Sequence, residues 1–234
     1  MKASLACATA ALLLAACASN SGPARRYYTL DPPSATAPVA QRAALRGGVL
    51  LVAPVAAAPF YDGRQIAFSS TDGMRGQYQF SHWAQPPAES VTTALTDSLG
   101  RAGLFADVAT PSPGLHADWL LSVRLVELYH DAQRPPGVVR LALSAELVDL
   151  HGHALVARRT FTACANAATN DADGAVAGAR TALATSVGAI VGWIDRTVPA
   201  SGAVHRNPGA PVPSGDEAAS ACNESNASIT ARYP

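Results

Sequence analysis

The chain has 234 residues, 49% of them hydrophobic, with 17 cationic and 17 anionic side chains. This length fits one domain with an ordinary hydrophobic core and excludes a multidomain assembly. The neutral charge balance and the lack of a basic stripe exclude nucleic acid as the expected partner, because binding to phosphates needs clustered cations.

The first sixteen residues have the features of a bacterial lipoprotein signal peptide. Lys2 carries a positive charge, an apolar run covers residues 5–14, and a Leu-Ala-Ala-Cys lipobox ends at Cys17. The run is too short to span a bilayer and closes on small residues, as export signals do. We expect cleavage after residue 16 and lipidation of Cys17, with a diacylglycerol and an N-acyl chain as membrane anchor and no other cofactor.

Residues 17–26 predict a flexible linker, since Ser, Asn, Gly, Pro and Ala dominate them. A linker of this type reaches roughly 15–20 Å, so the folded body should lie close to the membrane. The second mature residue is Ala18 rather than Asp. In sorting of the enterobacterial kind, that residue releases a lipoprotein from the inner membrane. We therefore expect the periplasmic face of the outer membrane.

Cysteines are few: beyond Cys7 and Cys17 the chain has only Cys164 and Cys222. No Cys-x-x-Cys pair occurs, which excludes zinc ribbons and thioredoxin-like chemistry. An oxidising periplasm would permit a bridge between Cys164 and Cys222, and the sequence leaves their pairing open.

The N-terminal half predicts short strands. A Tyr-Tyr-Thr-Leu run at residues 27–30, stopped by prolines, is typical of an edge strand. The apolar run at residues 49–52 predicts a strand that is buried on both faces. Residues 66–68 and 77–80 flank a Thr-Asp-Gly turn and predict a hairpin.

A helix is expected next, over residues 87–101, because proline stands at its start and glycine at its end. Residues 104–108 then predict a short strand. Residues 119–128 form a longer strand whose apolar phase shifts at Val126, which indicates a bulge. Residues 139–147 alternate cleanly between apolar and polar side chains.

A further strand begins at Leu155 and completes an antiparallel meander. Asn170 or Asp171 then caps a helix whose apolar stripe continues to Val198. We expect an α+β fold in which two helices cover an antiparallel sheet, in the order strands, helix, meander, helix. The domain should span residues 27–198, followed by a disordered tail at 199–234.

Catalytic and metal-binding patterns are missing from the sequence. His151 and His153 share an extended segment, yet a zinc site needs at least a third ligand. His116 and Asp118 are near each other, but no Gly-x-Ser-x-Gly elbow supplies a nucleophile. We therefore expect neither catalytic residues nor a metal site, and not an enzyme.

Residues 59–66 form a polar and aromatic loop directly after a buried strand, where proteins commonly display functional side chains. Asp62 and Arg64 could either staple this loop or contact a partner. The residues by themselves do not distinguish these two roles.

Several short motifs follow one another in a fixed order: the lipobox, Tyr-Tyr-Thr-Leu-Asp-Pro from residue 27, Val-Ala-Pro-Val from 52, Tyr-Asp-Gly-Arg-Gln-Ile from 61 and Trp-Ala-Gln-Pro from 83. In this combination the chain resembles the ABC-type transport auxiliary lipoproteins, of which the paraquat-inducible protein C type is the best-known branch. The resemblance extends to about Val198. It departs from the family pattern at Gly63, at Gln85, which replaces an acid, and at Pro87, which replaces a leucine.

The resemblance implies a noncatalytic component of an MCE/ABC-type system for lipid transport between membranes, which docks the periplasmic end of the conduit. It also implies an MCE-domain partner and homo-oligomers. The partner-binding residues would be Tyr61, Asp62, Arg64, Gln65 and Trp83. A structural lipoprotein that stabilises another outer-membrane assembly is one alternative. A membrane-anchored periplasmic hydrolase is another, although the chain lacks a nucleophile, an acid pair or a metal set for it.

Overall fold

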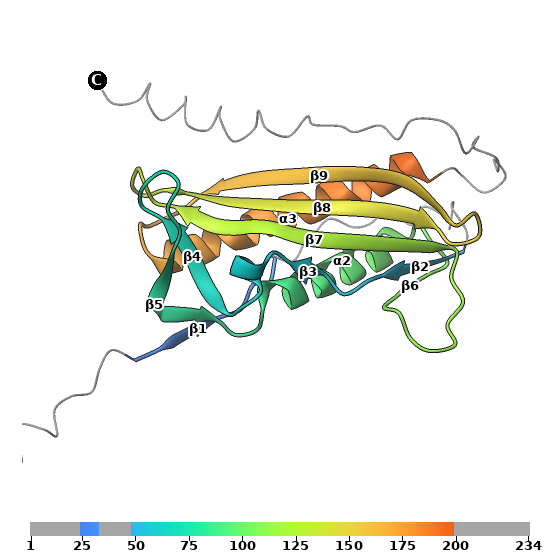
Figure 1. Ribbon diagram of the computed structural model, residues 1–234, viewed down its shortest axis with the longest axis horizontal. Coiled ribbons are helices and arrows are strands. Elements are labelled where there is room, and N and C mark those ends of the chain that lie inside the picture. Colours follow the sequence, from blue (N-terminus) through green and yellow to red (C-terminus); the bar gives the residue numbers. More distant parts are fainter. Residues whose placement is uncertain (1–23, 33–47, 199–234) are drawn as a thin grey trace, which may run out of the picture.

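A nine-stranded sheet and two helices make up residues 24–32 and 48–198, the parts that the computed structural model describes (Figure 1). This confirms the predicted α+β class. The predicted signal peptide, Cys17 and the tail from residue 199 lie outside the described residues, as does the linker up to residue 23.

The three longest strands form the expected antiparallel meander: β7 (Trp119–Asp131), β8 (Val138–Asp149) and β9 (Ala154–Asn166). Their side chains alternate between the helix-covered face and the other face of the sheet. The pairing of β7 with β8 shifts register between Leu125 and Glu127. This irregularity confirms the bulge that the change of apolar phase at residue 126 predicts.

Three short strands lie one after another along the other edge of β7, all parallel to it: β2 (Val49–Val52), β3 (Ala56–Ala57) and β4 (Gln65–Ser69). Pro54 separates β2 from β3, and Pro59 follows β3. Proline has no N–H to donate to β7, so the strand is interrupted at each of them. The second interruption opens the loop that leads to β4.

The sheet is mixed rather than antiparallel throughout. β4 and β5 (Gly76–Trp83) form the predicted antiparallel hairpin, while β1 (Arg26–Tyr28) runs parallel to β5 at the sheet edge. β6 (Asp107–Ala109) runs parallel to β2. The helix α2 (Pro87–Ala102) supplies the crossover that parallel strands need and that a hairpin cannot provide.

Both helices begin and end near the expected residues. The chain leaves α2 through Gly103, which adopts a left-handed conformation with φ of 61°. The second helix, α3 (Ala172–Thr197), begins at Asp171, whose carboxylate accepts a hydrogen bond from the N–H of Gly174 at 3.0 Å. This contact confirms the predicted N-cap.

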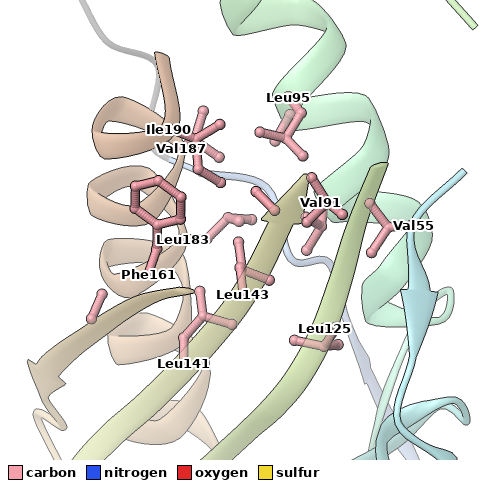
Figure 2. Close-up of a cluster of buried hydrophobic side chains, with 14 of the residues drawn as sticks. Val55, Val91, Leu95, Leu125, Leu141, Leu143, Phe161, Leu183, Val187 and Ile190 are labelled. Carbon is pink, nitrogen blue, oxygen red and sulfur yellow. The ribbon is translucent and has the colours of Figure 1, made fainter. Parts of the chain in front are cut away.

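The core lies between the helices and one face of the sheet. Figure 2 shows Leu183 and Ile190 of α3 and Leu95 of α2 facing Leu143 of the sheet, and all four are fully buried. Each such side chain contributes about 1.5–3 kcal/mol by leaving water. By length and composition α3 could cross a membrane, yet more than half of its most apolar window is buried in the fold. Its apolar stripe is therefore accounted for by this core.

Cys164 lies on β9 and is disulfide-bonded. Cys222, the partner considered in the sequence analysis, lies outside the described residues.

Candidate functional site

The loop between β3 and β4 is held against β7 at its start. The N–H of Ala58 donates to the carbonyl oxygen of Leu125 at 2.8 Å, and the N–H of Tyr61 donates to the carbonyl oxygen of Ala58 at 2.8 Å. Residues Pro59–Tyr61 thereby form one turn of 3-10 helix, which begins with a proline. The loop is thus an ordered projection from the sheet edge.

The end of the loop is tied to the end of β5 through Arg64. Its Nε donates to the carbonyl oxygen of Trp83 at 3.1 Å, and the N–H of Trp83 donates to the carbonyl oxygen of Arg64 at 2.7 Å. The guanidinium carbon of Arg64 also lies 5.4 Å from the ring centroid of Tyr27, within the range of a cation–π contact. Arg64 therefore joins the loop, β5 and β1.

The neighbouring tyrosine of the Tyr-Tyr motif connects this region to α3. The hydroxyl of Tyr28 donates to Asp173 at 2.8 Å, and Arg26 forms an ion pair with the same carboxylate at 2.8 Å. Burial, followed by the hydrogen bond to Asp173, raises the pKa of Tyr28. Arg180 of α3 donates two hydrogen bonds to the carbonyl oxygen of Thr29, at 3.1 and 2.9 Å. Residues 26–29 are thus secured to α3 from outside the core.

Four of the five predicted partner-binding residues lie at or near the surface. Asp62, Arg64 and Gln65 are exposed, and Tyr61 is half-buried against the edge of the core. Trp83 differs, because only 2% of its surface is accessible. Its indole belongs to the hydrophobic core, so in this structure the side chain is not available to a partner.

The structure separates the two residues of the charged pair: Arg64 staples the loop to β5, whereas Asp62 takes no part in that contact. Across residues 24–32 and 48–198, no ion pair joins these two side chains, and Arg64 bonds to Trp83 instead. The carboxylate of Asp62 is left at the surface.

Two exposed aromatic side chains belong to the same region but were not predicted as site residues, one in β1 and one in the loop itself. Tyr27 is 57% exposed and Phe60 is 43% exposed. The ring of Phe60 meets Tyr61 edge-on, with centroids 5.3 Å apart. Tyr27 stands within a recognised motif and Phe60 within the polar and aromatic loop at residues 59–66. The sequence does not show that their side chains are exposed, because exposure depends on the orientation of the strand and the loop.

Two of the side chains considered above for catalysis or metal binding, Asp118 and His151, lie close to each other. Asp118 accepts a hydrogen bond from the N–H of Val49 at 2.6 Å and lies 3.5 Å from His151. Within the described ranges, no group of three or more His, Cys, Asp or Glu side chains is placed to hold a metal ion.

Comparisons with known proteins agree with the arrangement of motifs. A family model described as the ABC-type transport auxiliary lipoprotein component matches residues 28–191. No curated protein matches the chain significantly.

Two solved structures share the fold. One is a protein from Xanthomonas campestris assigned to the family DUF330, with 25% identity and a TM-score of 0.61, covering 73% of this chain and 95% of its own. The other is described only as an uncharacterized protein, with 18% identity and a TM-score of 0.59, covering 74% and 99%.

Proposed function

Because the chain belongs to the ABC-type transport auxiliary lipoprotein family, we propose that it is an outer-membrane lipoprotein and a noncatalytic component of an MCE/ABC-type system for lipid transport between membranes. The single observation that carries the proposal is the family match over residues 28–191, which takes in the strands from β2 to β9, α2 and the loop after β3. In this role the acyl chains on Cys17 hold the protein at the periplasmic face of the outer membrane. The folded body docks the periplasmic end of the conduit.

The docking surface comprises the exposed loop residues Asp62, Arg64 and Gln65 with the neighbouring aromatic rings of Tyr27 and Phe60. Arginine and aromatic side chains are enriched at protein interfaces, because they combine a large contact area with directed polar groups. The loop is held by hydrogen bonds at both ends, at Ala58 and at Arg64. Binding would therefore order few additional groups, which limits its entropic cost.

Homo-oligomers are part of the same proposal, because several copies arranged in a ring could meet a ring of MCE-domain subunits. Analytical ultracentrifugation of the detergent-solubilised lipoprotein measures its oligomeric state. A uniform monomer across the working concentration range would contradict it.

Photocrosslinking in cells tests the docking surface. A photoreactive residue at position 62 or 65 should capture an MCE-domain protein, whereas one at exposed Arg158 on β9, toward the opposite side of the sheet, should not. Capture of an outer-membrane assembly factor instead would favour a structural lipoprotein. Equal capture from all three positions would contradict a specific docking surface.

A further inference from the structure

A polar pocket lies between two hairpin loops at one end of the sheet. The loop that joins β4 to β5 forms one wall and the loop that joins β7 to β8 forms the other; Figure 1 shows both at the same end of the molecule. Its volume is about 410 Å³, and small-ligand sites commonly measure roughly 300–1,000 Å³. None of the five predicted partner-binding residues lines it.

One side of the pocket carries a charge pair that is already satisfied. The Nε of Arg140 donates to the carboxylate of Asp131 at 3.1 Å, and the two side chains are 25% and 18% exposed. A partly buried pair of this kind neutralises itself and leaves neither charge in need of a ligand.

Arg75 presents a second, firmly positioned guanidinium. Its guanidinium carbon lies 3.7 Å from the ring centroid of Tyr129, and its Nη1 donates a hydrogen bond to the carbonyl oxygen of Met74 at 3.2 Å. Burial alone would lower the pKa of Arg75, but the neighbouring Tyr61, Tyr129 and Glu127 raise it. The group is therefore charged at every physiological pH and needs little reorganisation to meet an anion.

Arg134 and Asp72 face the pocket from its opposite walls. Both residues are exposed, and neither forms an ion pair with any other residue that the structure describes. Among the residues that line the pocket, three guanidinium groups against two carboxylates leave one net positive charge; Glu127, which acts on Arg75, does not line it. Guanidinium groups bind phosphate through paired, charge-assisted hydrogen bonds, so this charge favours a phosphate-bearing ligand.

We propose that this pocket binds a phosphate group, which lies between Arg75 and Arg134. Asp72, on the wall that faces Arg134, is placed to bind an amine carried by the same ligand. The phosphate could belong to a lipid headgroup or to a small soluble molecule. The site is separate from the docking surface and does not depend on the proposed transport function.

Calorimetric titration of the full-length mature lipoprotein in detergent tests the proposal with three soluble probes: inorganic phosphate, glycerophosphoethanolamine and, as the uncharged control, glycerol. We expect saturable binding of the two phosphate-bearing probes and no binding of glycerol. Arg134→Gln should weaken phosphate binding about tenfold, which corresponds to the loss of about 1.4 kcal/mol. Arg158→Gln, which removes an exposed arginine on β9, should leave it unchanged.

The variants also separate the two sources of phosphate. If the wild type binds glycerophosphoethanolamine more tightly than inorganic phosphate, and Asp72→Asn weakens that binding, the site takes a lipid headgroup. If the wild type binds inorganic phosphate more tightly, and Asp72→Asn leaves that binding unchanged, the site takes free phosphate. No saturable binding to the wild type, or equal loss in Arg134→Gln and Arg158→Gln, would overturn the proposal. Thermal unfolding of each variant establishes that the fold is intact, and the crosslinks from position 62 report separately on the docking surface.

Discussion

Arg64 and Trp83 bind each other twice, through the Arg64 side chain at 3.1 Å and through the Trp83 backbone N–H at 2.7 Å. The indole of Trp83 is buried in the core, whereas Arg64 is exposed and belongs to the proposed docking surface. This residue pair therefore holds the loop in a fixed position relative to the core. Changes at the two residues should have different consequences.

Arg64→Gln should weaken partner capture more than it weakens the fold. The change removes the bond to the Trp83 carbonyl and the contact with Tyr27, which together cost about 1 kcal/mol of unfolding free energy at an exposed position. Urea unfolding measures the stability change, and crosslinking from position 62 measures capture. Arg158→Gln serves as the matched control; if it lowers capture equally, the loop has no special role.

Trp83→Ala should destabilise the whole domain. Removing a fully buried aromatic ring costs about 3–5 kcal/mol, because the lost contacts leave a cavity in the core. Trp83→Phe retains most of the buried surface and should cost clearly less. Denaturant unfolding of both variants checks the order. An alanine variant as stable as the wild type that still loses partner capture would instead indicate direct contact by Trp83.

Stability should fall as the pH drops below about 6.5, through His130. This imidazole is buried, with Nδ1 2.8 Å from the Tyr78 hydroxyl and Nε2 2.9 Å from the Pro136 carbonyl oxygen. Burial lowers the pKa of His130, although the bond to Pro136 and the charges of Asp131 and Asp171 oppose that effect. Burial and the charge of Asp171 raise the pKa of Tyr78 to about 12, so its hydroxyl remains a donor to Nδ1.

The folded protein consequently binds fewer protons at His130 than the unfolded chain does. Its stabilising effect is complete above the ordinary pKa of 6.5 and is lost as the pH falls from there through the depressed folded value. Urea unfolding of the wild type and of His130→Leu between pH 7.5 and 5 checks this. Parallel pH profiles for the two proteins would contradict the assignment.

Asp171→Ala should cost about 1 kcal/mol, since the N-terminus of α3 loses its cap. The carboxylate accepts bonds from Gly174 N–H at 3.0 Å and from the Thr169 hydroxyl at 2.6 Å, and these lower its pKa, the first more than the second. Asp171→Ser keeps a capping oxygen and should cost less. Because the pKa is depressed, the contribution is present above the ordinary value of 3.8 and declines as the pH falls below it. Acid unfolding curves compare the three proteins.

Cys17→Ser should abolish incorporation of labelled palmitate and release the protein from the membrane fraction. The acyl chains are the proposed anchor, and each buried methylene contributes about 0.8 kcal/mol to membrane binding. Palmitate labelling and membrane fractionation are compared between cells that express the wild type and cells that express Cys17→Ser. Palmitate incorporation that persists in the serine variant would contradict lipidation at this residue.

Strands and helices with strong local patterns were predictable to within a few residues. The period-two alternation of β8, the capped stripe of α3 and the apolar run of β2 are each encoded by neighbouring side chains. β3 escaped prediction because a two-residue strand carries no period. Its existence depends on the adjacent edge of β7.

The candidate site was only partly predictable. The Tyr-Asp-Gly-Arg-Gln loop was recognisable by its motif, and the exposure of Asp62, Arg64 and Gln65 agrees with a surface role. Trp83 lies in an equally recognisable motif, yet its side chain is buried. A motif identifies the segment, whereas the face on which each side chain lies depends on strand register.

The local sequence determined the strands, the helices and their caps, the lipobox and the family motifs. Each of these depends on residues that lie within about one helical turn or one strand of each other. The tertiary structure alone decided the parallel pairings along β7, the burial of Trp83 and the pocket that holds Arg75 and Arg134. These features join residues far apart in the chain, as Arg26 and Asp173 are, 147 positions from each other. Such contacts depend on the pairing and packing of distant segments, and no local periodicity encodes them.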